Sequence, residues 1–74
     1  MATPDATIDV RDMLCAQALA VVAQSIGQLR AGEVASVHYN TDDVKHDLLV
    51  WAHDRGHQID VAAPGILQIQ IGHP

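Results

Sequence analysis

The chain has 74 residues, enough for one domain and too few for a catalytic domain beside a separate cofactor domain. Hydrophobic residues make up 49% of the sequence and charged residues 18%, a composition typical of a folded chain and not of a disordered one. The net charge of −5 and the aromatic content of 3% argue against non-specific binding to nucleic acid or to an anionic membrane, because such binding needs basic faces or stacking platforms.

We expect no targeting segment and no membrane span. Residues 1–9 lack the basic and apolar regions of a signal peptide, and no stretch reaches the ~18–20 consecutive apolar residues of a span. The sequence therefore predicts a cytoplasmic protein. Its single cysteine, Cys15, excludes an internal disulfide, so the thiol is either a small core residue or a reactive group.

The first part of the chain predicts a strand followed by a helix. Residues 7–10 alternate in polarity and end at the polar pair Arg11-Asp12, as a short strand does. Between residues 15 and 30, apolar side chains recur at spacings of three and four, which predicts one amphipathic helix. These side chains are Leu19, Val22, Ile26 and Leu29. We expect Gly32 to stop this helix, because glycine tolerates positive φ.

The middle of the chain predicts a second strand and a second helix. Residues 34–39 are rich in β-branched and aromatic side chains, which favours a strand. Asn40 and Thr41 offer side-chain oxygens that can cap a helix, and Arg55-Gly56 is typical of a helix end. The apolar residues of this helix recur at i, i+4, i+7 and i+8. They are Val44, Leu48, Trp51 and Ala52.

The last part of the chain predicts a hairpin. Residues 57–62 and 67–71 alternate in polarity on either side of a turn at Pro64-Gly65. The element order is therefore βαβαββ. Because each strand-helix-strand unit favours parallel neighbours and the hairpin requires an antiparallel pair, the sheet must be mixed.

Each predicted helix has one apolar stripe, and the strands alternate instead of being apolar throughout. We therefore expect residues 1–74 to form a single α/β domain, a two-layer sandwich of a mixed four-stranded sheet with two helices on one face. The other face should lie in water and carry His38, Gln68 and Gln70.

Several short motifs occur in a characteristic order between residues 8 and 59. They are Ile8-Asp9, Met13 two residues before Cys15, Gly32-Glu33, Asp47-Leu48, Trp51 and Gly56-His57. On these residues the chain resembles the TusA-like (SirA-type) sulfur-carrier family, whose element order is also βαβαββ. The family's Cys-Pro-x-Pro motif is replaced here by residues 15–18, Cys-Ala-Gln-Ala, and Asp12 stands where the family has glycine.

Cys15 is the candidate catalytic residue. At the start of the first predicted helix, free backbone N–H groups and the helix dipole stabilise a thiolate, so we expect its pKa to be lowered. Arg11 should add positive charge near the thiol, and Asp12 should oppose it. Ala16 and Ala18 lie in the expected first turn, where proline could be restored without breaking the helix.

Two functions follow from this interpretation. The resemblance implies a sulfur-transfer protein that holds sulfane sulfur as a persulfide on Cys15 and passes it on, without a cofactor. Its partners would be sulfur donor and acceptor proteins, with a desulfurase-type or rhodanese-type donor. The family's tasks are tRNA thiolation, cofactor assembly and sulfur oxidation. The alternative is a diverged, non-catalytic protein-binding adapter or regulator in which Cys15 is structural, since free cysteine is often buried. We expect a monomer or a weak dimer.

The five histidines do not predict a metal site. His53 and His57 are four residues apart, but Gly56 lies between them at the expected helix end. The sequence has no Cys-x-x-Cys or His-Glu-x-x-His pattern. It also lacks a Ser-His-Asp signature and a glycine-rich phosphate loop. We therefore interpret the histidines as solvated surface residues and expect no metal.

Overall fold

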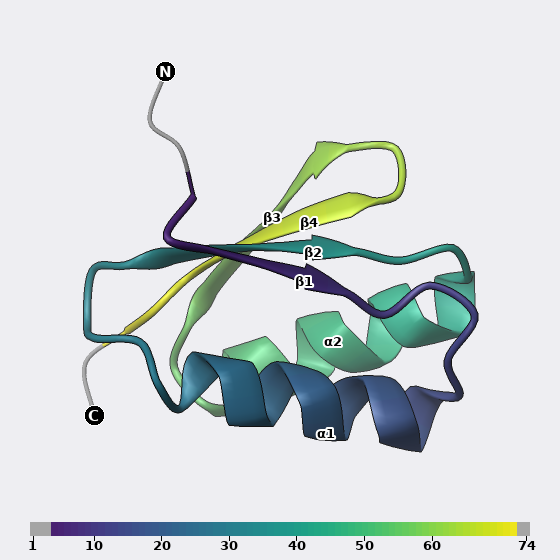
Figure 1. The fold of residues 1–74 in the computed structure, drawn as a ribbon, viewed down its shortest axis with the longest axis horizontal. Helices are drawn as coiled ribbons and strands as arrows, with labels where there is room; N and C mark the ends of the chain where they lie inside the picture. The colour runs from purple at the N-terminus through teal and green to yellow at the C-terminus, as the bar shows by residue number, and fades with distance from the viewer. Residues whose placement is uncertain (1–3, 73–74) are drawn as a thin grey trace.

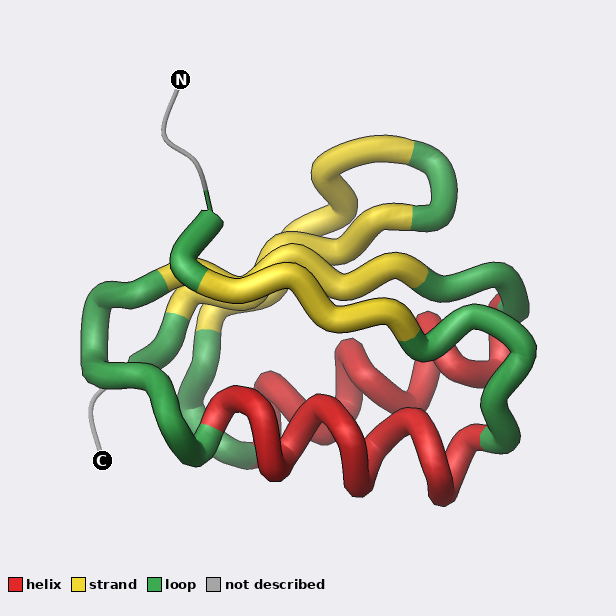
Figure 2. The backbone as a smooth tube through the Cα atoms, viewed as in Figure 1, coloured by secondary structure: helices red, strands yellow, loops and turns green. Residues whose placement is uncertain are grey.

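The computed structural model describes residues 4–72. Its elements are β1 (Ala6–Asp9), α1 (Cys15–Ile26), β2 (Val34–His38), α2 (Asp42–Asp54), β3 (Gln58–Ala63) and β4 (Ile66–Gln70). The strands form one sheet in the order β1-β2-β4-β3, and both helices lie on one face of it (Figures 1 and 2). The predicted two-layer α/β sandwich is confirmed, and each strand begins and ends within one residue of its expected position.

The inner strands of the sheet are β2 and β4. β1 is parallel to β2, whereas β4 is antiparallel to both β2 and β3, so the sheet is mixed. The fully buried Val37 on β2 lies between Ile8 on β1 and Leu67 on β4. Because side chains alternate along a strand, the residues before and after each of these three face away from the helices. Among them are the exposed Gln68 and Gln70, as expected.

α1 ends four residues earlier than the periodicity predicts. Its buried residues recur every four positions and face the sheet: Ala18, Val22 and Ile26. Gly27 follows as the C-cap and donates its N–H to the carbonyl of Ala23. Glycine is a poor helix former, so the helix does not continue to Arg30. The expectation that Gly32 stops the helix is wrong, because Gly32 has φ +89° in the turn that leads into β2.

α2 has the ends that the sequence predicts. The hydroxyl of Thr41 caps it by accepting a hydrogen bond from the N–H of Val44 at 3.3 Å. Asp42 and Asp43 occupy the first turn, where the helix dipole favours negative charge. Gly56, with φ +78°, follows the C-terminal cap. Neither helix of the described part of the chain is long and apolar enough to cross a membrane.

The core between the two layers is aliphatic. Its largest fully buried side chains are Leu48, Leu67, Ile69, Val10, Val22 and Val37. Trp51 is only partly buried and packs at the edge of the core. Val61 shares its side of β3 with Ile59 but is 50% exposed. The reason is that the end of the β3–β4 hairpin bends away from the helix layer (Figure 1).

Candidate functional site

Cys15 is the first residue of α1, as the sequence predicts. Leu14 precedes it in extended backbone and is 79% exposed, and no side chain caps this helix end. The free thiol is partly buried and packs against the core. The first N–H groups of a helix have no partner within the helix, so backbone donors lie close to this sulfur.

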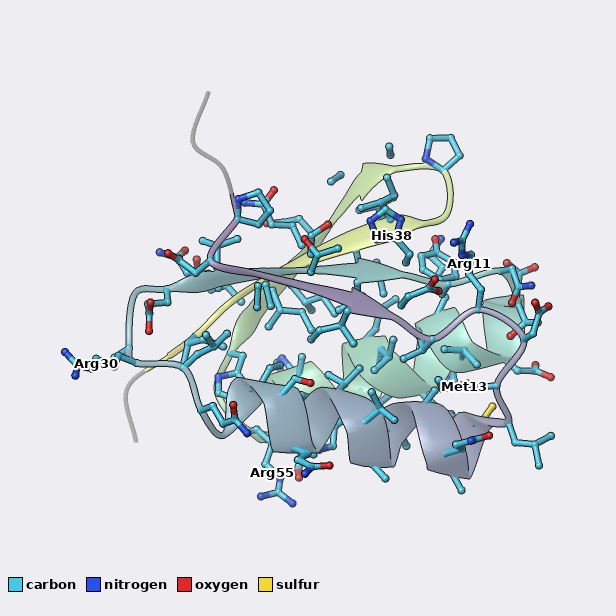
Figure 3. All side chains as sticks on the ribbon, viewed as in Figure 1. Arg11, Met13, Arg30, His38 and Arg55 are labelled. Atoms are coloured by element: carbon cyan, nitrogen blue, oxygen red, sulfur yellow. The ribbon has the colours of Figure 1, made fainter. Side chains whose placement is uncertain are left out.

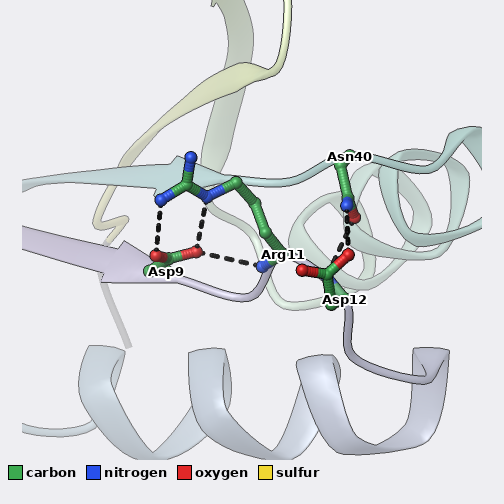
Figure 4. A network of polar contacts seen from close by, with 4 residues as sticks. All are labelled: Asp9, Arg11, Asp12 and Asn40. Atoms are coloured by element: carbon green, nitrogen blue, oxygen red, sulfur yellow. Dashed lines mark hydrogen bonds and ion pairs between the residues drawn. The ribbon is translucent and has the colours of Figure 1, made fainter.

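The loop that precedes Cys15 is hydrogen-bonded to the loop before α2 (Figure 4). Asp12 has φ +65°, in the left-handed region that aspartate adopts more readily than most residues. Its N–H donates to Oδ1 of Asn40 at 3.0 Å, and its own Oδ1 accepts from Nδ2 of Asn40 at 2.7 Å. This reciprocal pair holds the starts of α1 and α2 in a defined relation.

Arg11 does not act on the thiol as expected. Its guanidinium donates to both carboxylate oxygens of Asp9, at 3.0 and 2.9 Å, and its backbone N–H donates to the same carboxylate at 3.0 Å. These bonds hold the pKa of Asp9 at about 2 and raise the pKa of Arg11. The guanidinium lies at the level of the sheet, whereas Met13 lies nearer the start of α1 (Figures 3 and 4). The positive charge of Arg11 is therefore directed to Asp9, not to Cys15.

The expected lowering of the thiol pKa is wrong in sign. Burial, followed by the neighbouring carboxylates of Asp47 and Asp43, raises the pKa of Cys15. Asp47 contributes more to this shift than Asp43 does, because a nearby carboxylate favours the protonated thiol, and the backbone at Cys15 only partly compensates. The carboxylates that oppose a thiolate thus belong to α2, and the neighbour expected in this role, Asp12, is paired with Asn40 instead.

Asp47 and Asp43 are the site residues that sequence reasoning missed. They lie about thirty residues from Cys15 in the chain and reach it only because α2 packs beside α1. Asp43 lies in the first turn of α2, where the helix dipole already accounts for a carboxylate. Asp47 belongs to a motif of the family resemblance, and that motif was the one signal that could have pointed to it.

The alanines that replace the two prolines are not equivalent. The N–H of Ala18 donates to the carbonyl of Leu14 at 2.8 Å, and Ala18 is fully buried. Proline at this position would remove that bond, so the expectation that proline is tolerated at both positions is wrong for Ala18. Ala16 is exposed and one residue inside the helix. With alanine at both positions, α1 begins at Cys15.

The described histidines, at positions 38, 46, 53 and 57, do not form a metal site. Within residues 4–72, no group of three or more histidine, cysteine or acidic side chains is placed to hold a metal ion. His46 and His53 are exposed. His57 is partly buried and accepts a hydrogen bond from the N–H of Gly72 at 3.0 Å through Nδ1. The chain matches no protein-family model and no curated protein, so its functional interpretation rests on the residues themselves.

Proposed function

We propose that this chain is a small cytoplasmic sulfur carrier of the TusA-like type, with Cys15 as the residue that holds the sulfur. The observation that carries the proposal is the position of the only cysteine, at the first residue of α1 beside the exposed Leu14. A carrier must present its sulfur to two partners in turn. A helix start at the edge of a small domain is suited to that task.

The loop before Cys15 supports the resemblance to this family. Asp12 stands where the family has glycine, and it has φ +65°, a conformation that glycine adopts without strain. The side chain of Asn40 bonds to Asp12 on both its N–H and its carboxylate, which compensates for the lost glycine. Asp12 thus holds a backbone conformation that glycine could also adopt at this position.

The proposed reaction is one thiol–persulfide exchange. The thiolate of Cys15 attacks the outer sulfur of a persulfide on a donor protein. A new S–S bond forms on Cys15, the S–S bond of the donor breaks, and the donor leaves as a thiolate. Atoms and electrons balance without an oxidant or a cofactor. The raised pKa of Cys15 keeps most of the thiol protonated near neutral pH, so loading should become faster as the pH rises.

The second candidate is a non-catalytic adapter that binds a protein partner. The observations that favour it are the partial burial of Cys15 against the core and the raised pKa of the thiol. Both are properties of a packing cysteine. In this function the sulfur never reacts, and partner binding does not depend on it.

Intact mass after sulfur loading tests the carrier proposal. The purified chain is incubated with a cysteine desulfurase and cysteine, and separately with polysulfide, at neutral pH and above pH 9.0, the ordinary pKa of a thiol. We expect the mass to increase by one or more sulfur atoms and to return to its original value with reductant. Cys15→Ser is the matched control and should gain nothing.

A wild-type mass that stays unchanged at both pH values, while a family member with both prolines is loaded, would contradict the carrier proposal. The adapter would then be favoured. Its own test is capture of a partner by the wild type and by Cys15→Ser with equal affinity. A partner bound only through a mixed disulfide or a persulfide would exclude the adapter.

A further inference from the structure

A pocket of about 400 Å³ lies at the far end of the molecule from Cys15, where the last turns of α1 and α2 meet the end of β4. Ile26, Leu29 and Ile71 form its apolar wall, and Trp51, Arg55 and His57 line the remainder. α1 spans Cys15–Ile26, and at ~1.5 Å per residue the pocket is about 17 Å along the helix from the thiol. Its position makes it independent of the sulfur site.

Direct contacts hold the walls of this pocket. The rings of Trp51 and His57 lie 5.7 Å apart at 43° to each other. The N–H of Gly72 donates to Nδ1 of His57 at 3.0 Å. A Cβ at Gly72 would collide with the carbonyl oxygen of Gly56, so only glycine permits this close approach of the chain end to the turn after α2. The pocket is therefore formed before any ligand arrives.

The polar side chains of the pocket are all hydrogen-bond donors. Arg55 carries a guanidinium, which has donors and no acceptor, and the indole N–H of Trp51 is also a donor only. Nδ1 of His57 accepts from the backbone, so the hydrogen of the neutral ring is on Nε2. Among residues 4–72, no acidic side chain lines the pocket.

Such a lining favours one class of ligand. The apolar wall suits a hydrocarbon body, and donors without acceptor side chains beside them favour an acceptor group on the ligand. The carbonyl ends of α1 and α2 add partial negative charge near the pocket, and Arg55 is the only residue with a full charge in its lining. A carboxylate satisfies Arg55 through two parallel hydrogen bonds, which a neutral acceptor does not do.

We propose that the pocket binds a compact small-molecule carboxylate with an apolar body. The apolar body contacts Ile26, Leu29 and Trp51, and the carboxylate accepts from Arg55. The volume lies within the ~300–1,000 Å³ of typical small-molecule sites. This binding activity is additional to sulfur transfer and does not depend on it.

Three probes with the same body but different head groups test the proposal on the wild-type chain. They are 3-cyclohexylpropanoate, 3-cyclohexylpropanamide and 3-cyclohexylpropylamine. Trp51 is the only tryptophan of the chain, so its fluorescence reports occupancy of this pocket directly. We expect a saturable change with the carboxylate, binding of the amide that is weaker by about tenfold or more, and no binding of the amine.

Two arginines supply a matched pair of variants. Arg55→Gln should weaken carboxylate binding by about tenfold or more, because it removes the charged donor. Arg30→Gln removes the same charge from an exposed residue outside the pocket and should leave binding unchanged (Figure 3). Thermal unfolding of both variants checks that each is folded.

Equal binding of the carboxylate and the amide would overturn the proposal, as would preference for the amine or the absence of any saturable change. Equal losses of carboxylate affinity in Arg55→Gln and Arg30→Gln would mean that only the net charge matters, and would also overturn the proposal. Cys15→Ser should bind the carboxylate as the wild type does. A failure here therefore leaves the sulfur-carrier test unaffected, and the reverse also holds.

Discussion

Replacing Ile69 with alanine tests the arrangement of the sheet and helices most directly. Ile69 is fully buried on β4, an inner strand, and it faces the helices between Ala35 on β2 and Ile59 on β3. The change removes three carbon groups, each worth about 0.8 kcal/mol on burial, and the cavity that remains brings the cost to ~3–5 kcal/mol. A chain of this length is expected to have only ~4–11 kcal/mol of stability.

Urea unfolding, followed by the fluorescence of Trp51, measures the effect. Ile69→Ala should lower the midpoint by roughly 1 M or more, given about 1–3 kcal/mol per M for small domains. Because that loss approaches the whole free energy of unfolding, we add the milder substitution Ile69→Val, which should cost ~0.5–1.5 kcal/mol. Gln68→Ala is the matched control on the exposed face and should change the stability by no more than about 0.5 kcal/mol. A larger loss in Gln68→Ala than in Ile69→Val would refute the register of β4.

Three further predictions concern the site and its loop. The rate of thiol alkylation of wild-type Cys15 should keep rising above pH 9.0. Asp47→Asn should move the midpoint of the rate–pH curve to lower pH, because it removes a carboxylate that raises the thiol pKa. An equal shift in Asp54→Asn, at the C-terminal end of α2, would contradict this. The pKa of Asp9 is depressed from 3.8 to about 2, so its pairing with Arg11 stabilises the fold above pH 3.8, and that stability is lost as the pH falls through about 2. The urea midpoint of Asp9→Asn should therefore decline less across this pH range than that of the wild type, and parallel declines would count against the pairing. Asp12→Ala and Asp12→Gly lose the same side-chain bonds, but only alanine is strained at φ +65°. The alanine variant should therefore be less stable than the glycine variant by about 1 kcal/mol in urea unfolding. Equal stabilities would mean that the backbone at residue 12 leaves the left-handed conformation in the variants.

The candidate site was predictable from the sequence only in its location. One cysteine before an apolar stripe is enough to place Cys15 at the start of α1, because both features lie within a few residues of each other. The sign of the pKa shift was not predictable. It depends on burial and on Asp47, and distance along the chain does not indicate which carboxylates will lie beside the sulfur. For Arg11 the proximity to Cys15 in sequence was misleading, because Asp9 is closer still and forms a bidentate pair with it.

Apolar periodicity by itself determined the architecture of this protein, since the alternation of Leu67, Gln68 and Ile69 and the four-residue spacing of the α1 stripe depend on local backbone geometry. Only the tertiary structure decided what surrounds the thiol and where a pocket opens. Trp51 belongs to the predicted apolar stripe and packs against the core, but only the tertiary structure places it beside His57, where the ends of both helices and β4 meet. Periodicity specifies which face of an element is buried, whereas charges and cavities depend on which elements pack together, and that is settled only when the whole chain folds.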